Sequence, residues 1–555
     1  MYICSQKINQ FVNNKNRMKN GSKQFVRVAE LMFISSVGAG CGQNVNNNDN
    51  PNIVVILVDD MGYSDLGCYG GEIPTPHIDR LAENGLRFRH FYNTSRSCPT
   101  RASLLTGLYQ HQTGIGMMTT EAGNNFDFGV AGYRGYLNKN CVTIAEVLKE
   151  AGYHTYMTGK WHLGSDTLYK RPLQRGFDEF FGSYAGAFSY FDPQGARCLI
   201  DGADTIRAPK DFYTTDAFTD RAIQYIDKNK DGQPFFLYLA FNAPHWPLHA
   251  KEDDIQKFVG KYKQGWDVLR ENRLQKQIEL GLFDKNMALS PRDERVRAWD
   301  EVSEEQKEKS DYRMAVYAAQ IYAIDRNVGK LTDYLKKTKQ LDNTLIIFLS
   351  DNGACAEPYE EFGGGRQTEI NDLEKSGDIS YGIGWANLSN TPFRLYKNNA
   401  TEGGIATPFI AHWPAKIKSE KGKFTDVRGH ILNIMPTILE ATGASYPEEF
   451  QGYTIQPLES ISLLPTLLGN EQKIDGYQFF EHSYNRAATK GKWKAISKVE
   501  SDIWQLYDLE TDRTELHDVS VLYPDVVIDL ATRWQDWAIR CKVLPKGERT
   551  RNSYD

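Results

Sequence analysis

Strands and helices alternate along most of the chain, and this order restricts the fold more than any other feature of the sequence. The segment Asn52–Val58 is a continuous run of mostly β-branched residues, typical of a strand buried on both faces of a parallel sheet. Three more strands are expected at 153–157, 235–241 and 343–349. Helical spacing separates them, at 76–84, 142–150 and 314–337. The sequence therefore predicts an α/β sandwich built on a mostly parallel central sheet.

Two glycines are expected to mark helix ends. Gly85 follows the helical segment 76–84, and Gly152 follows the segment 142–150. Glycine is favoured just beyond a helix because it adopts the left-handed backbone conformation without steric cost. Both residues are therefore interpreted as helix C-caps.

The last part of the chain differs from the rest. After about residue 470, short strand-like runs at 493–496 and 504–509 precede a helix expected from about Pro524 to Ile539. This order predicts a smaller C-terminal α+β subdomain with a short antiparallel sheet.

A charged, helical stretch from about 251 to 312 also interrupts the alternation. Such an insertion is expected at the rim of a site or against a neighbouring domain. We expect a leader and polar linker at 1–50, a main catalytic domain containing this insertion at 51–465, and the C-terminal subdomain at 466–555.

Charge argues against nucleic acid as a partner and weighs mildly against other polyanions, and hydropathy gives no sign of a membrane span after residue 50. The net charge is −6 and no basic tract is present, which argues against nucleic-acid binding and against a polyanion held by bulk charge. A single anionic group in a pocket remains compatible with this charge. After residue 50 no stretch approaches the roughly 18 consecutive apolar residues of a membrane span.

The N-terminal segment resembles a bacterial lipoprotein signal. Basic residues precede a modest apolar run at 31–37, then small residues and Cys41, and then an Asn-rich stretch. We expect export to the periplasm or outer membrane of a Gram-negative bacterium, with Cys41 as the lipid anchor and Met18 as a candidate start. The eight cysteines form no C-x-x-C pair, so zinc-site spacing is absent and any disulfide pairing stays open.

Acidic and amide side chains follow two of the expected strands. Asp59 and Asp60 come directly after the first strand, and Asp351 and Asn352 follow the strand at 343–349. Ligands of open α/β sheets bind outside the carboxyl ends of the strands. A set of oxygen ligands suits Ca²⁺ or Mg²⁺ and is poor for zinc or copper. The sequence therefore predicts a site for a hard divalent cation at this edge.

The stretch Ser97-Cys98-Pro99-Thr100-Arg101, continuing to Gly107, is the most specific motif. It resembles the signature around the nucleophile of the type I sulfatases, (Cys or Ser)-x-Pro-x-Arg followed by x-x-Leu-x-Thr-Gly. Ser97 occupies the first position, whose side chain the family converts to formylglycine, and Cys98 occupies the unconstrained second position.

Three further segments are similar to sulfatase motifs. Lys160 and His162 lie in Gly-Lys-Trp-His-Leu-Gly, where an extended backbone would point both side chains the same way. His245 lies in Ala-Pro-His-Trp-Pro, and Lys397 precedes Glu402-Gly403-Gly404 by five residues. The resemblance extends from about Asn52 to Leu544 and is greatest to the bacterial arylsulfatase branch.

The resemblance implies an alkaline-phosphatase-like sandwich and a sulfuric ester hydrolase. It implies one divalent cation, Ca²⁺ in preference to Mg²⁺, held by Asp59, Asp60, modified Ser97, Asp351 and Asn352. One oxygen of the hydrated formylglycine attacks sulfur, and collapse of the resulting hemiacetal releases sulfate.

The resemblance also implies a role for each of the other site residues. Arg101 stabilises the nucleophile and Asp351 accepts its proton. Lys160, His245 and Lys397 bind the sulfate, with His245 protonating the leaving oxygen. His162 deprotonates the second hydroxyl. A preorganised set of cations is the main available source of stabilisation for such a monoanion.

The expected substrate is a sulfated glycan, with loop 184–190 and the insertion at 251–312 setting selectivity. Because Ser97 replaces the Cys of eukaryotic members, the resemblance implies a maturating enzyme of the anaerobic, radical type. Two alternatives stay open: a formylglycine-dependent phosphonate or phosphate ester hydrolase of the same fold, and a catalytically silent glycan-binding protein. The sequence lacks the clustered Asp-x-x-x-His pattern that forms the second metal site of two-zinc phosphatases.

Overall fold

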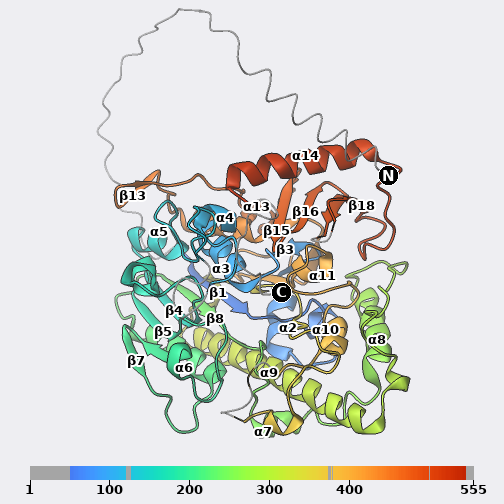
Figure 1. Ribbon diagram of the computed structural model, residues 1–555. Helices are drawn as coiled ribbons and strands as arrows, with labels where there is room; N and C mark the ends of the chain where they lie inside the picture. The colour runs from blue at the N-terminus through green and yellow to red at the C-terminus, as the bar shows by residue number, and fades with distance from the viewer. Residues whose placement is uncertain (1–49, 120–126, 373–376, 378, 499–500, 545–555) are drawn as a thin grey trace, which may run out of the picture. The chain divides into compact units, whose positions relative to one another are not determined.

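The computed structural model describes residues 50–555 except for residues 120–126, 373–376, 378, 499–500 and 545–555 (Figure 1). The expected leader, Met18 and the lipid-anchor candidate Cys41 lie outside the described residues.

A ten-stranded mixed sheet forms the centre, in the order β11-β2-β10-β9-β1-β8-β4-β5-β6-β7. Its parallel core consists of β9 (Thr344–Ser350), β1 (Asn52–Val58), β8 (Phe235–Ala240), β4 (His154–Lys160) and β5 (Glu179–Ser183). The outer strands are β11 (Lys423–Thr425), β2 (Leu86–Phe88), β10 (Phe409–His412), β6 (Leu199–Asp201) and β7 (Asp204–Ile206). β10 runs antiparallel to β9, and β6 runs antiparallel to β5. The expected mostly parallel sheet is confirmed.

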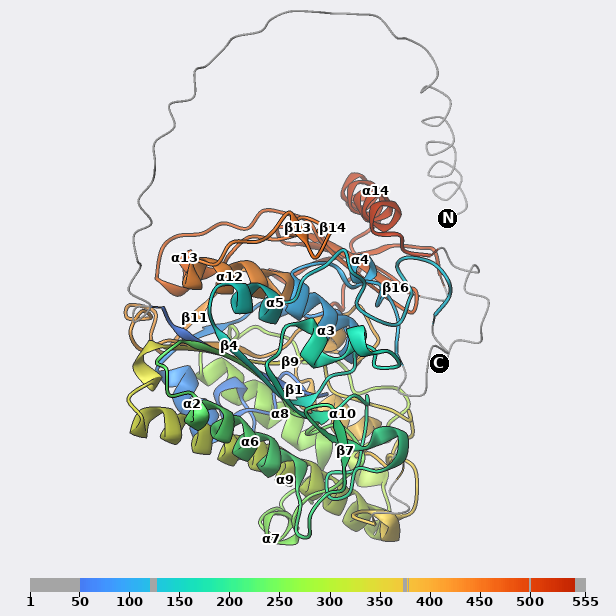
Figure 2. The ribbon, with the colours of Figure 1, turned by 90° about the vertical axis from the view of Figure 1, so that its left-hand side faces the viewer.

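Helices cover both faces of this sheet (Figure 2). One face packs against α2 (Pro76–Glu83), α6 (Thr214–Lys228) and α9 (Glu304–Lys337), and the other against α3 (Ser97–Thr106), α5 (Ile144–Glu150) and α12 (Ile434–Thr442). Alternate residues of β1 enter the two cores: Val54 and Ile56 contribute to one, and Val55 and Leu57 to the other. Such burial on both faces explains the continuous apolar run in the sequence.

The C-terminal subdomain contains a second, antiparallel sheet, drawn in orange to red in Figure 1. Its strands are β15 (Gln478–His482), β16 (Asn485–Lys490), β17 (Trp493–Ser497) and β18 (Gln505–Asp508). Helix α14 (Pro524–Cys541) packs on it through Leu530, Trp534 and Trp537. This small core also includes Tyr109 and Leu432 from the preceding region. The predicted C-terminal α+β architecture is confirmed.

Short elements complete the described part of the chain: α4 (Gln110–Thr113), α7 (Glu252–Ile255), α8 (Gly265–Glu279), α10 (Ile383–Ser389), α11 (Glu402–Ile405), α13 (Leu464–Leu467), β3 (Phe91–Tyr92), β12 (Gly429–His430), β13 (Glu449–Phe450) and β14 (Tyr453–Thr454). Single 3₁₀ turns lie at Gly67–Tyr69, Leu168–Lys170, Pro172–Arg175, Gly195–Arg197, Trp299–Glu301, Leu341–Asn343, Gln367–Glu369 and Ile431–Asn433. No helix within the described ranges has the length and apolarity to span a bilayer. All six described cysteines, from Cys68 to Cys541, are free thiols.

Gly85 does not cap a helix, contrary to the interpretation from the sequence. Helix α2 ends at Glu83 with Asn84 as its cap, and Gly85 lacks the left-handed conformation that Gly152 adopts (φ 85°). A Cβ on Gly85 would lie 2.3 Å from the carbonyl oxygen of Ala411 in β10. The absence of a side chain therefore permits close backbone contact with the sheet.

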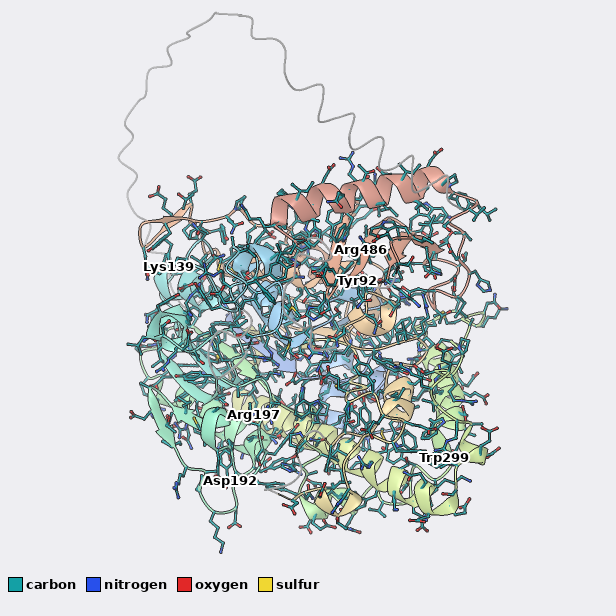
Figure 3. All side chains as sticks on the ribbon, viewed as in Figure 1. Tyr92, Lys139, Asp192, Arg197, Trp299 and Arg486 are labelled. Carbon is teal, nitrogen blue, oxygen red and sulfur yellow. The ribbon has the colours of Figure 1, made fainter. Side chains whose placement is uncertain are left out.

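The charged insertion packs on the main core, and the centroid of its Phe283 ring lies 5.5 Å from the Arg513 guanidinium of the C-terminal subdomain. Its helix α8 packs into the main core, where the Trp266 ring contacts Trp299 at 4.6 Å and Trp385 at 5.2 Å between centroids; Trp299 is labelled in Figure 3. Helix α9 begins at Glu304, ten residues before the expected Met314, because Ser303 caps it by accepting a hydrogen bond from the backbone of Gln306. The insertion is thus part of the main α/β unit.

Candidate active site

The carboxyl ends of β1 and β9 bring together the four side chains expected there. Val58 pairs with Ser350, so Asp59 and Asp60 meet Asp351 and Asn352 just beyond the sheet. The backbone N–H of Asp60 donates to Asp351 Oδ1 at 3.1 Å, and Asn352 Nδ2 donates to Asp60 Oδ1 at 2.7 Å. All four residues are buried. Parallel strand order therefore concentrates acidic and amide oxygens at one buried point.

Ser97, the first residue of α3, faces these oxygens. Its Oγ donates to Asp59 Oδ1 at 3.1 Å and lies 3.3 Å from Asn352 Oδ1. Cys98 turns away, with its Sγ 3.7 Å from both the Met117 carbonyl oxygen and Met118 Sδ. Burial raises the pKa of the Cys98 thiol to about 11, so it stays protonated. The geometry agrees with Ser97, and not Cys98, as the first motif position.

Three cations neutralise the carboxylates. Arg101, one turn along α3 from Ser97, lies 3.0 Å from Asp351 Oδ2 and donates to the Lys160 carbonyl oxygen at 3.0 Å. Lys160, the last residue of β4, lies 2.6 Å from Asp59 Oδ2. Lys397 lies 2.9 Å from Asp60 Oδ2. We call the group Asp59, Asp60, Ser97, Arg101, Lys160, His245, Asp351, Asn352 and Lys397 the strand-end cluster.

His245 belongs to this cluster. Its Nε2 lies 3.4 Å from Asp60 Oδ2 and 3.5 Å from Lys397 Nζ, and its Nδ1 lies 2.6 Å from the Trp246 carbonyl oxygen. The carbonyl can only accept, so Nδ1 carries the proton and Nε2 faces the cluster. Burial lowers the pKa of His245, against the opposing effect of Asp60 and Asp59.

His162 is placed differently from the expectation of an extended backbone. β4 ends at Lys160, and His162 has a left-handed conformation (φ 56°), so the two side chains do not follow strand alternation. Its Nε2 lies 3.1 Å from the Thr119 carbonyl oxygen, while no described residue hydrogen-bonds its buried Nδ1. Burial, Lys160 and Arg101 hold the pKa of His162 well below its usual range. The ring is a neutral acceptor beside the cations.

Burial and nearby charges set the protonation of the three carboxyls. Burial raises the pKa of Asp59, but Lys160, His245 and Arg101 outweigh it and hold that pKa below its ordinary range. Lys397 and His245 likewise overcome burial at Asp60. For Asp351, burial and the charge of Asp59 raise the pKa to about 7. Two carboxylates are thus firmly ionised, and the third exchanges its proton near neutral pH.

The residues of the cluster fit a divalent cation. Carboxylate, amide and hydroxyl oxygens from two strands and one helix converge in a buried space, which suits Ca²⁺ or Mg²⁺. One ligand atom each from Asp59, Asp60 and His245 also lies within 4.8 Å of the others. When Asp351 is ionised, the three carboxylates balance Arg101, Lys160 and Lys397, so an added dication would leave net positive charge for an anionic substrate.

The sequence prediction did not include Glu357, Cys355 and Arg96. Glu357 Oε2 lies 3.3 Å from Lys397 Nζ, and Arg96 forms an ion pair with the same carboxylate. Cys355 Sγ lies 3.7 Å from Lys397 Nζ. Their closeness in sequence to Asn352 and Ser97 is the one signal that could have indicated them.

The fold and this site define an ester hydrolase of the alkaline-phosphatase-like α/β class. Residues 51–444 match the sulfatase family, and residues 395–535 match the C-terminal part of N-sulphoglucosamine sulphohydrolase. The chain belongs to the sulfatase family, which confirms the resemblance seen in the sequence, and it is a sulfuric ester hydrolase.

Relatives extend over most of the chain. An uncharacterized sulfatase of Schizosaccharomyces pombe is 37% identical over 525 residues, 87% of this chain and 92% of the relative. The arylsulfatase of Klebsiella aerogenes is 34% identical over 446 residues, 78% of this chain and 94% of the relative. The crystal structure of Ps i-CgsB in complex with k-i-k-neocarrahexaose superposes with a TM-score of 0.65 at 29% identity, covering 88% of this chain and 93% of that chain.

Proposed function

We propose that this sulfatase removes sulfate from sulfated glycans, using formylglycine made from Ser97 and one bound Ca²⁺ ion. The observation that carries the proposal is the position of Ser97 Oγ, within 3.1–3.3 Å of oxygens of Asp59 and Asn352 and beside three buried cations. The similarity to an arylsulfatase and to a structure bound to a neocarrahexaose supports this class of substrate.

Asp59, Asp60, Asp351, Asn352 and residue 97 would hold the ion. When bound, such an ion supplies positive charge that favours ionised oxygens beside it. Formylglycine supplies a hydrated aldehyde with two hydroxyls, one that attacks sulfur and one that permits release of sulfate. The remaining residues position and protonate these groups.

The cations bind and neutralise the sulfate. Lys160 and Lys397 present ammonium groups at two neighbouring carboxylates, so both can turn toward an anion without leaving the cluster. Arg101 orients Asp351, the proton acceptor for the attacking hydroxyl. Because these donors are already buried and ordered, little reorganisation opposes stabilisation of the transition state.

Two histidines move protons. An arriving sulfate brings negative charge that opposes the effect of burial on His245, so its Nε2 takes a proton and delivers it to the leaving oxygen. His162 retains a neutral ring whose Nδ1, which no described residue hydrogen-bonds, is the acceptor for the second hydroxyl.

Maturation and location complete the proposal. Ser97 is only 2% exposed, so an anaerobic-type maturating enzyme must act on it before the chain folds. That order agrees with an exported protein anchored through Cys41 in the periplasm or outer membrane, because modification in the cytoplasm would precede translocation and folding.

The phosphate monoester alternative differs in the charge that the site must neutralise, whereas a phosphonate monoester carries one negative charge, as a sulfate monoester does. A phosphate monoester carries nearly two negative charges at neutral pH, and phosphatases of this fold use a second metal ion to balance them. In the described part of the chain, Asp59, Asp60 and His245 are the one group of three His, Cys or acidic residues close enough to share an ion. A one-ion site therefore favours the sulfate monoester over the phosphate monoester.

The deciding experiment compares one aryl leaving group as sulfate and as phosphate, with enzyme co-expressed with its maturating partner. We expect kcat/KM for the sulfate to exceed that for the phosphate by at least about 100-fold, or roughly 2.7 kcal/mol, with inorganic phosphate as a competitive inhibitor. Equal kcat/KM values for the two esters, or a higher value for the phosphate, would refute the proposal. A panel of sulfated saccharides then identifies the sugar, and binding without sulfate release would favour the silent glycan-binding alternative.

A further inference from the structure

A second group of buried charges links the C-terminal sheet to the segment that carries Lys397. Lys494 of β17 lies 2.9 Å from Glu402 Oε1 and 2.7 Å from Glu515 Oε1. Arg513 lies 3.0 Å from Glu402 Oε2, and Arg394 lies 3.6 Å from Glu515 Oε2. We call Arg394, Glu402, Lys494, Arg513 and Glu515 the clamp cluster. Its carboxylates are buried as completely as those of the strand-end cluster.

The clamp cluster holds both ends of the loop around Lys397. Arg394 lies before the lysine and Glu402 after it, and both contact Glu515, which accepts hydrogen bonds from the Glu402 backbone N–H at 3.2 Å. Asn485 Nδ2 donates to the carbonyl oxygen of Asn398, next to Lys397, at 3.0 Å. The C-terminal subdomain thus contacts the loop before, beside and after the lysine.

The loop conformation requires such support. Leu395 (φ 60°) and Asn398 (φ 75°) adopt the left-handed conformation, as does Glu515 (φ 60°). This conformation is unfavourable for residues other than glycine, especially for Leu, and persists only where the surroundings impose it. The contacts of Glu515 and Asn485 with this loop lie on either side of, or at, Leu395 and Asn398, so they can stabilise its unfavourable backbone conformation.

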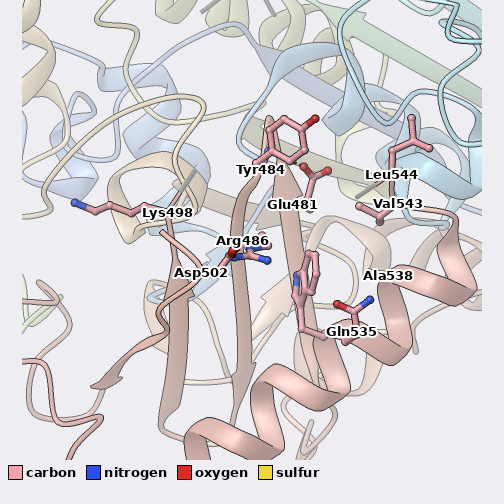
Figure 4. Close-up of a pocket in the computed structure, with 10 residues that line it drawn as sticks. Glu481, Tyr484, Arg486, Lys498, Asp502, Gln535, Ala538, Val543 and Leu544 are labelled. Carbon is pink, nitrogen blue, oxygen red and sulfur yellow. Dashed lines mark hydrogen bonds and ion pairs between the residues drawn. The ribbon is translucent and has the colours of Figure 1, made fainter. Parts of the chain in front are cut away.

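Asn485 is itself held firmly. It begins β16, and the next residue, Arg486, donates to Ser497 Oγ and lies 5.4 Å from the Trp534 ring of α14. Figure 4 shows Arg486, Tyr484 and Gln535 around a cavity of about 190 Å³ on this side of the hairpin. Arg486 thus links the strand that begins at Asn485 to Ser497 of β17 and to Trp534 of α14, while Asn485 contacts the loop.

We propose that Glu515 and Asn485 are positioning residues that hold the Lys397 ammonium against Asp60 at the strand-end cluster. The proposal rests on the function proposed above, in which Lys397 binds the sulfate. Burying five charged groups is expensive, and an apolar interface of the same volume is often equally stable. What the clamp cluster adds is a defined position for the loop, since two of its members, Arg394 and Glu402, bracket Lys397.

A double-mutant cycle on the mature, full-length enzyme tests this role. We expect Glu515→Gln to lower kcat/KM for an aryl sulfate about tenfold, and Asn485→Ala about threefold, within the range of couplings between neighbouring residues. In a Lys397→Ala background the same changes should have less than about a twofold effect, because the group they position is gone. Glu515→Asp should restore part of the activity lost in Glu515→Gln.

The matched control is Glu146→Gln, which removes a charge from another buried ion pair, Glu146 with Arg175 at 3.0 Å, that does not touch the Lys397 loop. It should lower Tm without changing kcat/KM. Equal fold losses for Glu515→Gln and Asn485→Ala with and without Lys397 would overturn the positioning role. Asn485→Ala removes only one hydrogen bond. If Glu515→Gln does not fold, the decrease in kcat/KM caused by Asn485→Ala, with and without Lys397, decides whether the positioning role holds. Unchanged activity in Lys397→Ala alone would instead refute the proposed function.

Discussion

The strand-end cluster and the clamp cluster are both buried and both pair carboxylates with lysine and arginine, but they differ in the other polar groups they contain. In the clamp cluster both oxygens of Glu402 have partners, Lys494 at one and Arg513 and Tyr92 at the other (Tyr92 is labelled in Figure 3). In the strand-end cluster, His245 Nε2 and Ser97 Oγ face carboxylates that already pair with cations. A cluster made mainly of ion pairs fixes structure, whereas one that adds a hydroxyl and an imidazole beside its ion pairs offers exchangeable partners and is suited to bind a ligand.

The largest expected effect is at Ser97, the nucleophile position of the strand-end cluster. Ser97→Ala should abolish sulfatase activity, because neither the hydroxyl nor the aldehyde derived from it is present. In the wild-type protein made with an anaerobic maturating partner, mass spectrometry of the peptide around residue 97 should show loss of two hydrogens.

Cys98→Ser is the matched control for this prediction. Its thiol faces Met117 and Met118, so the variant should retain activity. A fully active preparation with unmodified Ser97, or modification at Cys98, would contradict the assignment of the nucleophile.

A second prediction separates the two clusters by their response to metal. Asp351→Asn should lower kcat/KM by about 100-fold to 1000-fold, the range for losing one preorganised polar group. It should also remove the rise in Tm that Ca²⁺ gives to the wild type, since an ion stabilises only a fold that binds it. Thermal unfolding with Ca²⁺ and with chelator measures this difference.

Glu515→Gln in the clamp cluster serves as the comparison, and it should keep the rise in Tm with Ca²⁺. The same rise in Asp351→Asn as in the wild type would argue against Asp351 as a ligand. Two zinc ions per chain by elemental analysis would favour the phosphatase alternative.

The sequence predicts the strand-end cluster because local order places it. Each buried strand shows its apolar run, and the residues after it must lie at the carboxyl edge of the sheet, so Asp59 and Asp351 could be paired without coordinates. Motif spacing adds Lys160, His245 and Lys397. The backbone conformation of His162 could not be predicted, because its left-handed turn depends on contacts with Thr119 and Gly186.

The sequence does not predict the clamp cluster. Its members lie at positions from 394 to 515 in three separate segments, and each one alone is an ordinary charged residue. Only the packing of β17 and the segment after β18 against α11 brings them together. Apolar periodicity also does not show the role of Gly85, which depends on close contact with β10, or the start of α9, which depends on the Ser303 cap.

A third prediction tests whether water is excluded from the carboxylates of the clamp cluster. Lys494→Met should lower the free energy of unfolding by about 3–5 kcal/mol, because Glu402 and Glu515 lose the cation that they share. Urea denaturation with and without Ca²⁺ measures it, and the loss should be the same in both. A loss below about 1 kcal/mol, the value for exposed pairs, would show that water reaches these carboxylates.

The smallest effect concerns His430, at the junction of the main unit and the C-terminal sheet. Its ring contacts Phe480 at 5.4 Å and Tyr109 at 6.1 Å, and burial lowers its pKa to about 3. Since the folded pKa is below the unfolded value of about 6.5, the unfolded chain binds a proton first. The contribution of neutral His430 to the free energy of unfolding is therefore fully present above about pH 6.5. It falls by about 1.4 kcal/mol per pH unit as the pH drops toward 3.

His430→Asn should remove this dependence, at the cost of the ring contacts with Phe480 and Tyr109. His430 Nδ1 accepts the Leu432 N–H at 3.2 Å, and an Asn side-chain oxygen can accept the same bond as a helix cap. We expect a lower free energy of unfolding at pH 7.5, because the ring contacts are lost, and, between pH 6 and 4, a slope of that free energy against pH that is shallower by about one proton. Urea titrations at three pH values measure the slope. The same slope in His430→Asn as in the wild type would mean that His430 can be protonated in the folded protein. The junction around His430 would then be open to water, unlike the strand-end cluster and the clamp cluster.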